Sequence, residues 1–194
     1  MDQEKIGLLI RNLRLNREMT QKQLAEKLNL SDKTISKWER GLGSPDISLL
    51  IDLAGVFKVD VEEMLSGELT KNQMVGGNMK NSMFYICPLC GNLVLSTGSI
   101  NLSCCGRKLE EQEMKKATED QKLKVEAIDS QWYITSEHPM SKSEYISFVA
   151  FANSGKIEIE KQYPEWNLQV RIPKSSRGKL IWYSTRDGLL YQLI

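Results

Sequence analysis

The sequence predicts a multidomain fold, in which an all-α domain of five short helices precedes a small four-cysteine module and an all-β immunoglobulin-like sandwich. Three observations predict it. Apolar residues recur at helical spacing in the first third of the chain, all four cysteines lie between residues 87 and 105, and the apolar period changes to two beyond residue 122. By length alone, 194 residues have room for one large domain or two small ones.

The composition favours packed cores and argues against a membrane or secreted protein. Hydrophobic residues make up 41% of the chain. The N-terminus carries no signal-peptide pattern, and no apolar run approaches the roughly 18 residues that span a bilayer. We therefore expect a cytoplasmic protein with no membrane contact, in which thiols stay reduced.

Five helices are expected within residues 1–66, because their apolar residues can share one small core. Pro45 is expected at the first position of the fourth helix, where its missing N–H costs nothing. Asp60 and Glu63 are expected to cap the fifth helix. The spacing of Trp38 favours the core over stacking on a base. The predicted core residues are Ile6, Ile10, Leu13, Leu24, Leu28, Ile35, Trp38, Leu49, Leu50, Leu53, Phe57, Val61 and Leu65.

Residues 20–40 carry two short helical patterns on either side of a tight turn. Thr20 and Gln23 form a capping box for the first helix, and Ser31 caps the second by accepting a backbone hydrogen bond. Gly41 then supplies a left-handed stop. This arrangement predicts a helix-turn-helix whose second helix is a recognition helix.

The segment 5–66 resembles the phage-repressor-like (Xre-type) DNA-binding domains. T-Q-x-x-L-A opens the first helix of the pair, and S-x-x-T-I-S-K-W-E-R-G runs through the second. The resemblance implies a structural ion pair between Arg14 and Glu39. Taken alone, each polar residue fits a solvated helix face, but the whole pattern favours double-stranded DNA as a partner. The resemblance places at phosphates or base edges Gln21, Ser31, Asp32, Lys33, Thr34, Ser36 and Lys37.

The charge balance predicts modest DNA affinity for a single copy. The chain has a net charge of +1, and residues 1–66 hold ten Lys/Arg against eleven Asp/Glu. Since phosphate contacts dominate affinity for DNA, any positive field must be local. We therefore expect a homodimer that reads two half-sites about one helical turn apart.

Residues 67–82 are polar, contain a Gly-Gly pair and lack an apolar period, so they are expected to be a linker. The module at 83–110 then carries Cys87 and Cys90 in a C-P-L-C-G turn, followed after thirteen residues by Cys104 and Cys105. In a reducing compartment, two close pairs of cysteines favour a tetrathiolate metal site over disulfides. A redox C-x-x-C or buried inert cysteines are the alternatives.

The cysteine segments FYICPLCGNLV (84–94) and CCGRKL (104–109) resemble desulforedoxin and the N-terminal iron module of desulfoferrodoxin. The resemblance implies a small, mostly β site that holds iron in those relatives, which associate as dimers. Ligand type does not separate Zn²⁺ from a rubredoxin-type iron here. We expect zinc, because a rigid structural clip gains nothing from redox chemistry, with iron as the alternative.

A charged connector, partly helical, is expected at 111–121, and a β-sandwich at 122–194. Short segments of period two, separated by turns, predict seven strands in an antiparallel sandwich. The predicted strands are 124–128, 132–135, 145–152, 156–162, 168–172, 180–184 and 189–194.

Segments EHPMSKSEYI (137–146) and IWYSTRDGL (181–189) resemble the superoxide reductase domain of desulfoferrodoxin. That enzyme holds its iron with four histidines and a cysteine, whereas this chain has one histidine. His138 keeps a ligand position, but Glu144, Ser184 and Asp187 stand where a histidine, the cysteine and the last histidine would be. No histidine near Lys122 replaces the first ligand. We therefore expect the fold without this chemistry; another metal held by His138, Glu144 and Asp187 is the alternative.

These observations together predict a sequence-specific transcriptional regulator that is not an enzyme. Its metal-stabilised C-terminal region would serve dimerisation or, if the thiolates lose metal or oxidise, sensing. One rival is a superoxide reductase-like redox protein. The other is an antitoxin or adaptor whose sandwich binds a protein partner.

Overall fold

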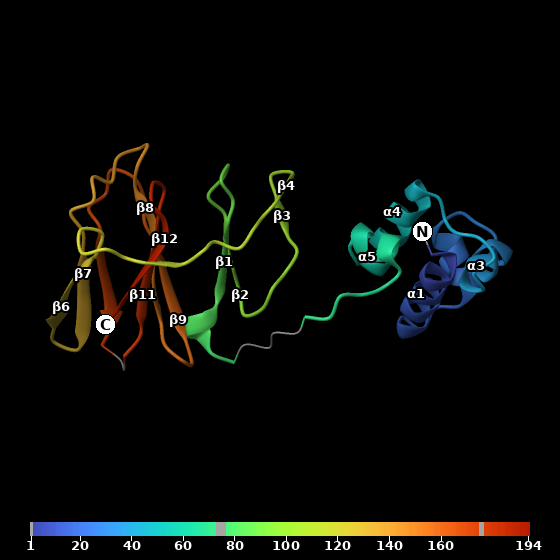
Figure 1. Ribbon diagram of the computed structural model, residues 1–194, viewed down its shortest axis with the longest axis horizontal. Helices are drawn as coiled ribbons and strands as arrows, with labels where there is room; N and C mark the ends of the chain where they lie inside the picture. Colours follow the sequence, from blue (N-terminus) through green and yellow to red (C-terminus); the bar gives the residue numbers. More distant parts are fainter. Residues whose placement is uncertain (1, 73–76, 175–176) are drawn as a thin grey trace. The chain divides into compact units, whose positions relative to one another are not determined.

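The computed structural model describes residues 2–72, 77–174 and 177–194. The chain divides into two compact units, Met1–Lys71 and Asn72–Ile194, which are coloured blue to teal and green to red in Figure 1. The first unit is all helical, and the second contains the cysteine module and the sandwich, so the predicted fold class is confirmed. No helix in the described ranges has both the length and the apolar character needed to cross a bilayer.

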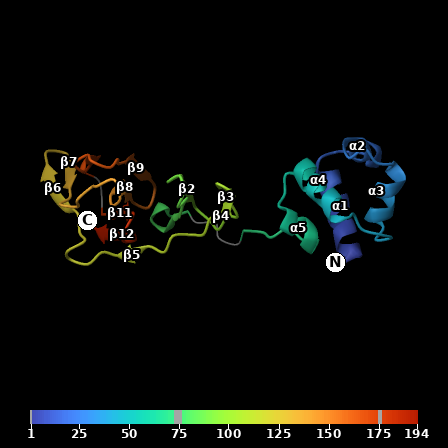
Figure 2. The same ribbon diagram turned by 90° about the horizontal axis from the view of Figure 1, so that it is seen from above.

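The helical unit contains five helices around one core (Figure 2). In both views α1 lies between α3 on one side and α4 and α5 on the other. The elements are α1 (Gln3–Asn16), α2 (Gln21–Lys27), α3 (Asp32–Glu39), α4 (Ile47–Phe57) and α5 (Val61–Ser66).

Three local expectations for this unit are wrong. Pro45 precedes α4, whose N-cap is Asp46, because the Asp46 carboxylate accepts the Leu49 N–H at 2.9 Å. Asp60 occupies the N-cap position of α5 but makes no side-chain capping bond. Leu65 is 37% exposed, and its neighbour Met64 is buried in its place. The errors at Pro45 and Leu65 are shifts of about one residue near a helix end, which the helical period alone does not resolve.

Gly7 allows α1 and α3 to approach closely. A Cβ at this position would lie 2.1 Å from the carbonyl oxygen of Trp38. That oxygen belongs to the last turn of α3 and accepts the Gly41 N–H at 2.9 Å, so it has little freedom to move. The close crossing of α1 and α3 therefore depends on glycine at position 7, which has no side chain.

The β unit has a five-stranded and a three-stranded sheet packed face to face. All seven predicted strands are present. The larger sheet has the order β5 (Lys115–Lys116), β12 (Gly188–Leu193), β11 (Lys179–Ser184), β8 (Ile146–Ala152) and β9 (Ile157–Lys161). The smaller has the order β10 (Gln169–Pro173), β7 (Gln131–Thr135) and β6 (Lys124–Ile128).

The cysteine module forms a third layer on the larger sheet. Its hairpin of β1 (Met83–Ile86) and β2 (Leu93–Ser96) lies beside the sandwich in Figure 1. Phe84 stacks on Phe148 of β8, with ring centroids 5.7 Å apart. Alternate residues of β8 therefore enter different cores: Val149 faces the smaller sheet, and Phe148 faces the module. This explains why β8 is apolar at every position except Ser147, a pattern typical of strands buried on both faces.

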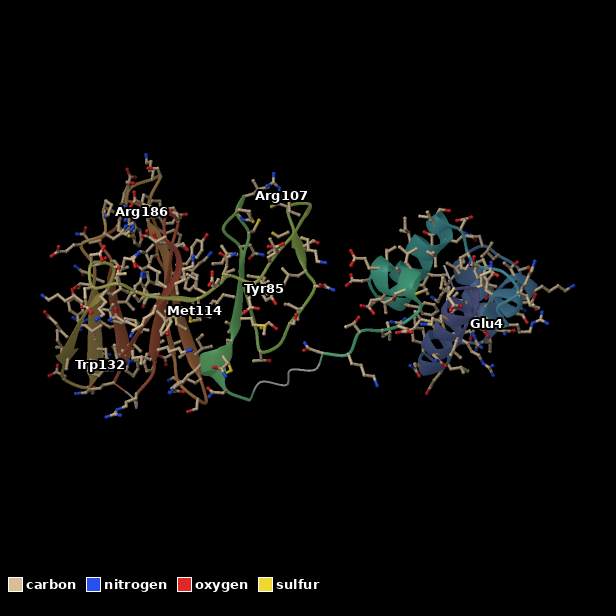
Figure 3. The ribbon with its side chains drawn as sticks, viewed as in Figure 1. Glu4, Tyr85, Arg107, Met114, Trp132 and Arg186 are labelled. Atoms are coloured by element: carbon tan, nitrogen blue, oxygen red, sulfur yellow. The ribbon has the colours of Figure 1, made fainter. Side chains whose placement is uncertain are left out.

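The connector at 111–121 is part of this packing and is not helical. Strand β5 lies within it and pairs in parallel with β12. Ala117 is buried in the sandwich core, and Met114, labelled in Figure 3, packs against the core between module and sheet. The expected linker at 67–82 contains a short 3-10 helix, Met79–Asn81, while residues 73–76 lie outside the described ranges.

Candidate functional site

Helix α3 begins after a turn that is capped by Ser31. Asn29, with φ of 55°, takes the left-handed conformation that asparagine tolerates. The Ser31 Oγ then accepts the Thr34 N–H at 3.2 Å, as the sequence predicted. Thr20 and Gln23 form the predicted capping box on α2, and Gly41, with φ of 70°, follows the end of α3. Local hydrogen bonds thus fix both ends of the helix pair.

The predicted DNA-contacting residues of α3 divide by exposure. Ile35 and Trp38 anchor the helix in the core, with exposed fractions of 0% and 5%. The opposite side carries the predicted contacts. Ser31, Asp32, Lys33 and Lys37 are exposed, whereas Thr34 and Ser36 are half-buried.

Arg40 is a further candidate that the list of predicted contacts omitted. It follows Lys33 and Lys37 at the spacing i, i+4, i+7, which aligns the three on one face of the helix. Its Nε donates to the Ser36 carbonyl at 3.1 Å, and its side chain is exposed. The signal was available, because the three cations lie at helical spacing within the predicted recognition helix.

Gln21 joins a buried network instead of facing only outward. Arg14 and Glu39 form the expected ion pair, with Nε to Oε1 at 2.6 Å and Nη2 to Oε2 at 2.8 Å. Gln21 Nε2 also donates to Glu39 Oε2 at 2.8 Å. Burial by itself would raise the pKa of Glu39, but the hydrogen bonds from Arg14 and Gln21 outweigh it and hold that pKa below its ordinary value. The network ties α1 and α2 to the end of α3.

The four cysteines converge as a metal site would require. Their Sγ atoms all lie within 4.8 Å of one another. Cys90 and Cys104 are 3.6 Å apart, and Cys104 and Cys105 are 4.0 Å apart. A tetrahedral site with metal–sulfur bonds of about 2.3 Å has sulfur–sulfur edges of about 3.8 Å. The residues present therefore fit a tetrathiolate ion such as Zn²⁺ or iron.

Two different turns deliver these sulfurs. The first pair lies in a loop closed by the Gly91 N–H, which donates to the Cys87 carbonyl at 2.9 Å. The second pair lies at the tip of a hairpin formed by β3 (Ser103–Cys104) and β4 (Arg107–Lys108). Its two turn residues, Cys105 and Gly106, have φ of 51° and 73°. Positive φ at both positions is the requirement of a type I′ turn. Two adjacent cysteines can therefore occupy this tip only if Cys105 adopts a left-handed conformation, which is strained for a residue other than glycine. Figure 3 labels Arg107 beside this tip.

The thiols do not titrate alike. Backbone N–H groups of Cys90 and Leu89 lower the pKa of Cys87 to about 6, which favours its thiolate at neutral pH. Hydrogen bonds with Cys90, Cys87 and Cys104 raise the pKa of Cys105 to about 12. Four thiolates held this close repel one another, so a divalent cation is the natural counter-charge for the cluster.

A cavity of about 730 Å³ lies at the end of the sandwich that carries Arg186 in Figure 3. Its inner wall includes the buried side chains of Ile146, Trp182 and Leu190. His138 contributes to the lining as well. Arg186 also lines the cavity, and its Nη1 pairs with Glu144 Oε1 at 2.7 Å.

Of the residues that the sequence placed at former iron-ligand positions, Ser184 and Asp187 bond to each other, whereas His138 Nε2 is buried without a hydrogen-bond partner in the described parts of the chain. Ser184 Oγ lies 3.3 Å from Asp187 Oδ2 and accepts the Asp187 N–H at 3.2 Å. The His138 Nδ1 accepts the Met140 N–H at 3.2 Å, and burial lowers the pKa of His138. The neutral ring then carries its proton on Nε2, which lies 3.8 Å from Glu144 Oε1. In this conformation neither ring nitrogen offers a free lone pair to a metal.

The helical unit is similar in sequence to known DNA-binding regulators. The helix-turn-helix family model matches residues 10–64. Over 59 residues, 30% of the chain, it is 44% identical to the HTH-type transcriptional activator BcrR of Enterococcus faecalis, covering 29% of that protein. Over 76 residues, 39% of the chain, it is 36% identical to the immunity repressor protein of Bacillus phage phi105, covering 53% of that protein. The chain therefore spans only about a third to a half of these curated relatives.

The β unit is similar in fold to a solved structure. The superoxide reductase of Treponema pallidum superimposes with a TM-score of 0.50 at 12% identity, covering 58% of this chain and 98% of that one. A likeness at this identity shows the fold alone. The chain thus joins a helix-turn-helix domain to a cysteine module and a superoxide reductase-like fold.

Proposed function

We propose that this protein is a sequence-specific, double-stranded-DNA-binding transcriptional regulator, and that it is not an enzyme. The observation that carries the proposal is α3 itself. Its buried face is fixed by Ile35 and Trp38, while Lys33, Lys37 and Arg40 align on its outer face. The match of residues 10–64 to the helix-turn-helix family supports the same function. The relatives in E. faecalis and phage phi105 are named as a transcriptional activator and a repressor, so the direction of regulation is left open.

In the proposed complex α3 enters the major groove. Lys33 and Lys37 can donate to guanine O6 and N7, and Asp32 can accept from cytosine N4. Arg40 lies farther along the same face and is suited to phosphate. Gln21 Nε2 donates one of its two hydrogens to Glu39. The second hydrogen remains available for the phosphate contact predicted from the sequence. The ion-pair network therefore sets the position from which Gln21 reaches DNA.

The cysteine cluster would hold Zn²⁺ or, alternatively, iron as a structural ion through Cys87, Cys90, Cys104 and Cys105. When bound, the ion supplies the charge that four close thiolates need. The module that it fixes packs on β8, so the ion also supports the outer face of the larger sheet. Elemental analysis of protein purified without added metal distinguishes the two ions, and a red protein would contain iron.

The proposal that the sandwich is not a superoxide reductase is supported by the chemistry of its cavity. Glu144, Ser184 and Asp187 are oxygen donors where the resemblance calls for two imidazoles and a thiolate. His138 uses Nδ1 to accept a backbone hydrogen bond. Arg186 adds a guanidinium that pairs with Glu144 at 2.7 Å. A fixed cation at this position opposes the binding of a second, metallic one.

The test is DNA binding by the full chain. An operator is first selected from random or genomic fragments, and Lys37→Ala is then compared with wild type by footprinting. Loss of a base-edge contact is expected to cost about 1–3 kcal/mol, or roughly 5- to 150-fold in affinity. The matched control is Lys58→Asn, which removes the same charge at the far end of α4, where φ of 47° suits asparagine.

Two outcomes contradict the proposal. One is that the purified chain selects no DNA sequence. The other is that Lys37→Ala and Lys58→Asn give the same footprint and affinity as wild type, with Lys37→Ala still folded by circular dichroism.

A further inference from the structure

Helix α4 exposes an apolar face that the rest of the helical unit does not cover. Ile47 and Ile51 are 63% and 54% exposed. Because they are four residues apart, they lie on one side of the helix, and Gly55 continues the same line. Single exposed apolar residues are common on protein surfaces, but two β-branched side chains in line on one helix form a patch.

Packing within the described helical unit does not require a glycine at position 55. Glycine in a helix interior lowers helix stability relative to alanine. At Gly7 and Gly178 a Cβ would collide with atoms 2.1 Å and 2.4 Å away, so those glycines are required for packing. A Cβ at Gly55 would meet nothing within 4 Å. The bare backbone at Gly55 would let a side chain from outside the helical unit approach α4 closely.

A shallow groove runs beside this face, between α4 and the end of α2. Its volume is about 480 Å³. Leu28 is buried and Val56 is half-buried, so these two side chains give the groove an apolar floor. The groove is lined by Lys27, Leu28, Asn29, Ile51, Asp52, Gly55 and Val56.

The sequence of this face is complementary to itself. If two α4 helices pair antiparallel about a two-fold axis at Ile51, residue 47 of each copy lies opposite residue 55 of the other. The large Ile47 side chain would then meet the bare backbone of Gly55, twice over. Such an isologous contact is the kind that closed two-fold dimers use.

The charges on the two sides of the groove agree with the same pairing. Lys27 projects from α2 and Asp52 from α4, and both are exposed. Neither forms an ion pair with another residue of the described parts of the chain. Across a two-fold axis, Lys27 of one copy can face Asp52 of the other, which satisfies two opposite charges in each half of the contact.

We propose that the α4 face, defined by Ile47, Ile51 and Gly55, is a dimer contact between the helical units of two copies of this chain. Since α1 lies between α4 and α3, a contact on α4 leaves α3 uncovered (Figure 2). The inference goes beyond the proposed function because it concerns a contact between two copies of the protein, whereas the proposed function concerns contact with DNA. Its failure would leave DNA binding by each copy untouched.

The first experiment locates the contact directly in the full-length protein. Isotopically heavy and light copies carrying Ile47→p-benzoylphenylalanine are mixed, irradiated and analysed by mass spectrometry. Crosslinks between heavy and light chains, from position 47 to the segment around residue 55, are the expected result. Intermolecular crosslinks that map elsewhere, or none at tens of micromolar protein, overturn the proposal.

The second experiment measures the strength of the contact by sedimentation equilibrium of the full chain. Ile51→Glu places two carboxylates on the axis and is expected to weaken self-association at least tenfold. Leu8→Glu is the matched control, because Leu8 is 58% exposed on α1 and lies outside the proposed contact. Equal self-association of the two variants overturns the proposal.

Substitution of Gly55 separates contact from folding. Gly55→Ala is expected to raise the unfolding temperature of the helical unit, whereas the bulkier Gly55→Leu, which blocks the approach of Ile47, is expected to weaken self-association at least tenfold. A folded Gly55→Leu variant that associates like wild type contradicts the assigned pairing.

Discussion

The helical unit and the β unit differ in how their functional residues relate to their folds. In α3, Ile35 and Trp38 fill the core, and Lys33 and Lys37 project from the same two turns. In the sandwich, the core strands are intact, yet Ser184 stands where the resemblance calls for a thiolate ligand. A fold rests on many distributed apolar contacts, whereas a site rests on a few side chains. The second can therefore change while the first persists.

The cysteine module allows the sharpest test of this comparison, because its fold and its site are the same residues. Cys90→Ser is expected to abolish stoichiometric metal binding and to release the β3–β4 hairpin, whose strands have two residues each. Structural zinc sites contribute roughly 10–16 kcal/mol of apparent binding free energy, so this is the largest effect. Elemental analysis gives the metal content, and amide hydrogen exchange compares residues 103–108 with α1. Full metal occupancy in the variant would count against a tetrathiolate site.

In the helical unit the largest effect is expected from the buried ion pair. Glu39→Ala leaves the Arg14 guanidinium buried without its partner and should destabilise this unit by about 3–5 kcal/mol. The pH dependence follows from the depressed pKa of Glu39. Its contribution is complete above the ordinary carboxyl pKa of about 4.3 and is lost as pH falls through the lower folded value.

Urea unfolding between pH 3 and 7 measures both effects. The control is Glu39→Gln, which keeps the shape of the side chain but should lack this part of the pH dependence. A loss below about 1 kcal/mol in Glu39→Ala would mean that the pair contributes no more than an exposed one.

Close backbone packing gives an intermediate effect. Gly7→Ala is expected to cost about 1–3 kcal/mol, because its Cβ would overlap the Trp38 carbonyl oxygen and push α3 away from α1. DNA affinity should fall with it, since α3 moves. Gly155→Ala in the β unit meets no atom within 4 Å and serves as the neutral control. Equal thermal unfolding of the two variants would contradict the helix crossing described above.

The smallest effect is expected at the sandwich cavity. His138→Asn retains a side-chain acceptor for the Met140 N–H and should change stability by less than about 1 kcal/mol. Metal content should be the same as in wild type, because the proposed ligands of the ion are the four cysteines and not His138. A fall in bound metal in this variant would revive the alternative in which His138, Glu144 and Asp187 form a second site.

Much of the local structure could be predicted because its causes are local. The capping box of Thr20 and the cap of Ser31 are contacts over three residues, so the sequence shows both partners at once. The helical and two-residue periods likewise reveal which face of each element is apolar. The least accurate expectations were helix ends, where Asp46 displaced Pro45 as the start of α4.

The candidate sites were predictable only in part. Sequence spacing identified the four cysteines, and helical spacing identified most of the exposed residues of α3. It did not show that Gln21 is shared with Glu39, because these side chains are 18 positions apart. It also did not show that the α4 face is open, since exposed and buried isoleucines look alike in a sequence.

The sequence alone determined the order of the parts: five helices, a cysteine module and a strand-rich region, each set by period, capping or spacing within a few residues. Only the tertiary structure decided that the module is a third layer on the sandwich and that the 111–121 segment joins a sheet through β5. It also decided that His138 turns its acceptor nitrogen to the backbone. The physical reason is range. Capping and periodicity act between near neighbours, whereas Phe84 meets Phe148 only after the intervening chain has folded.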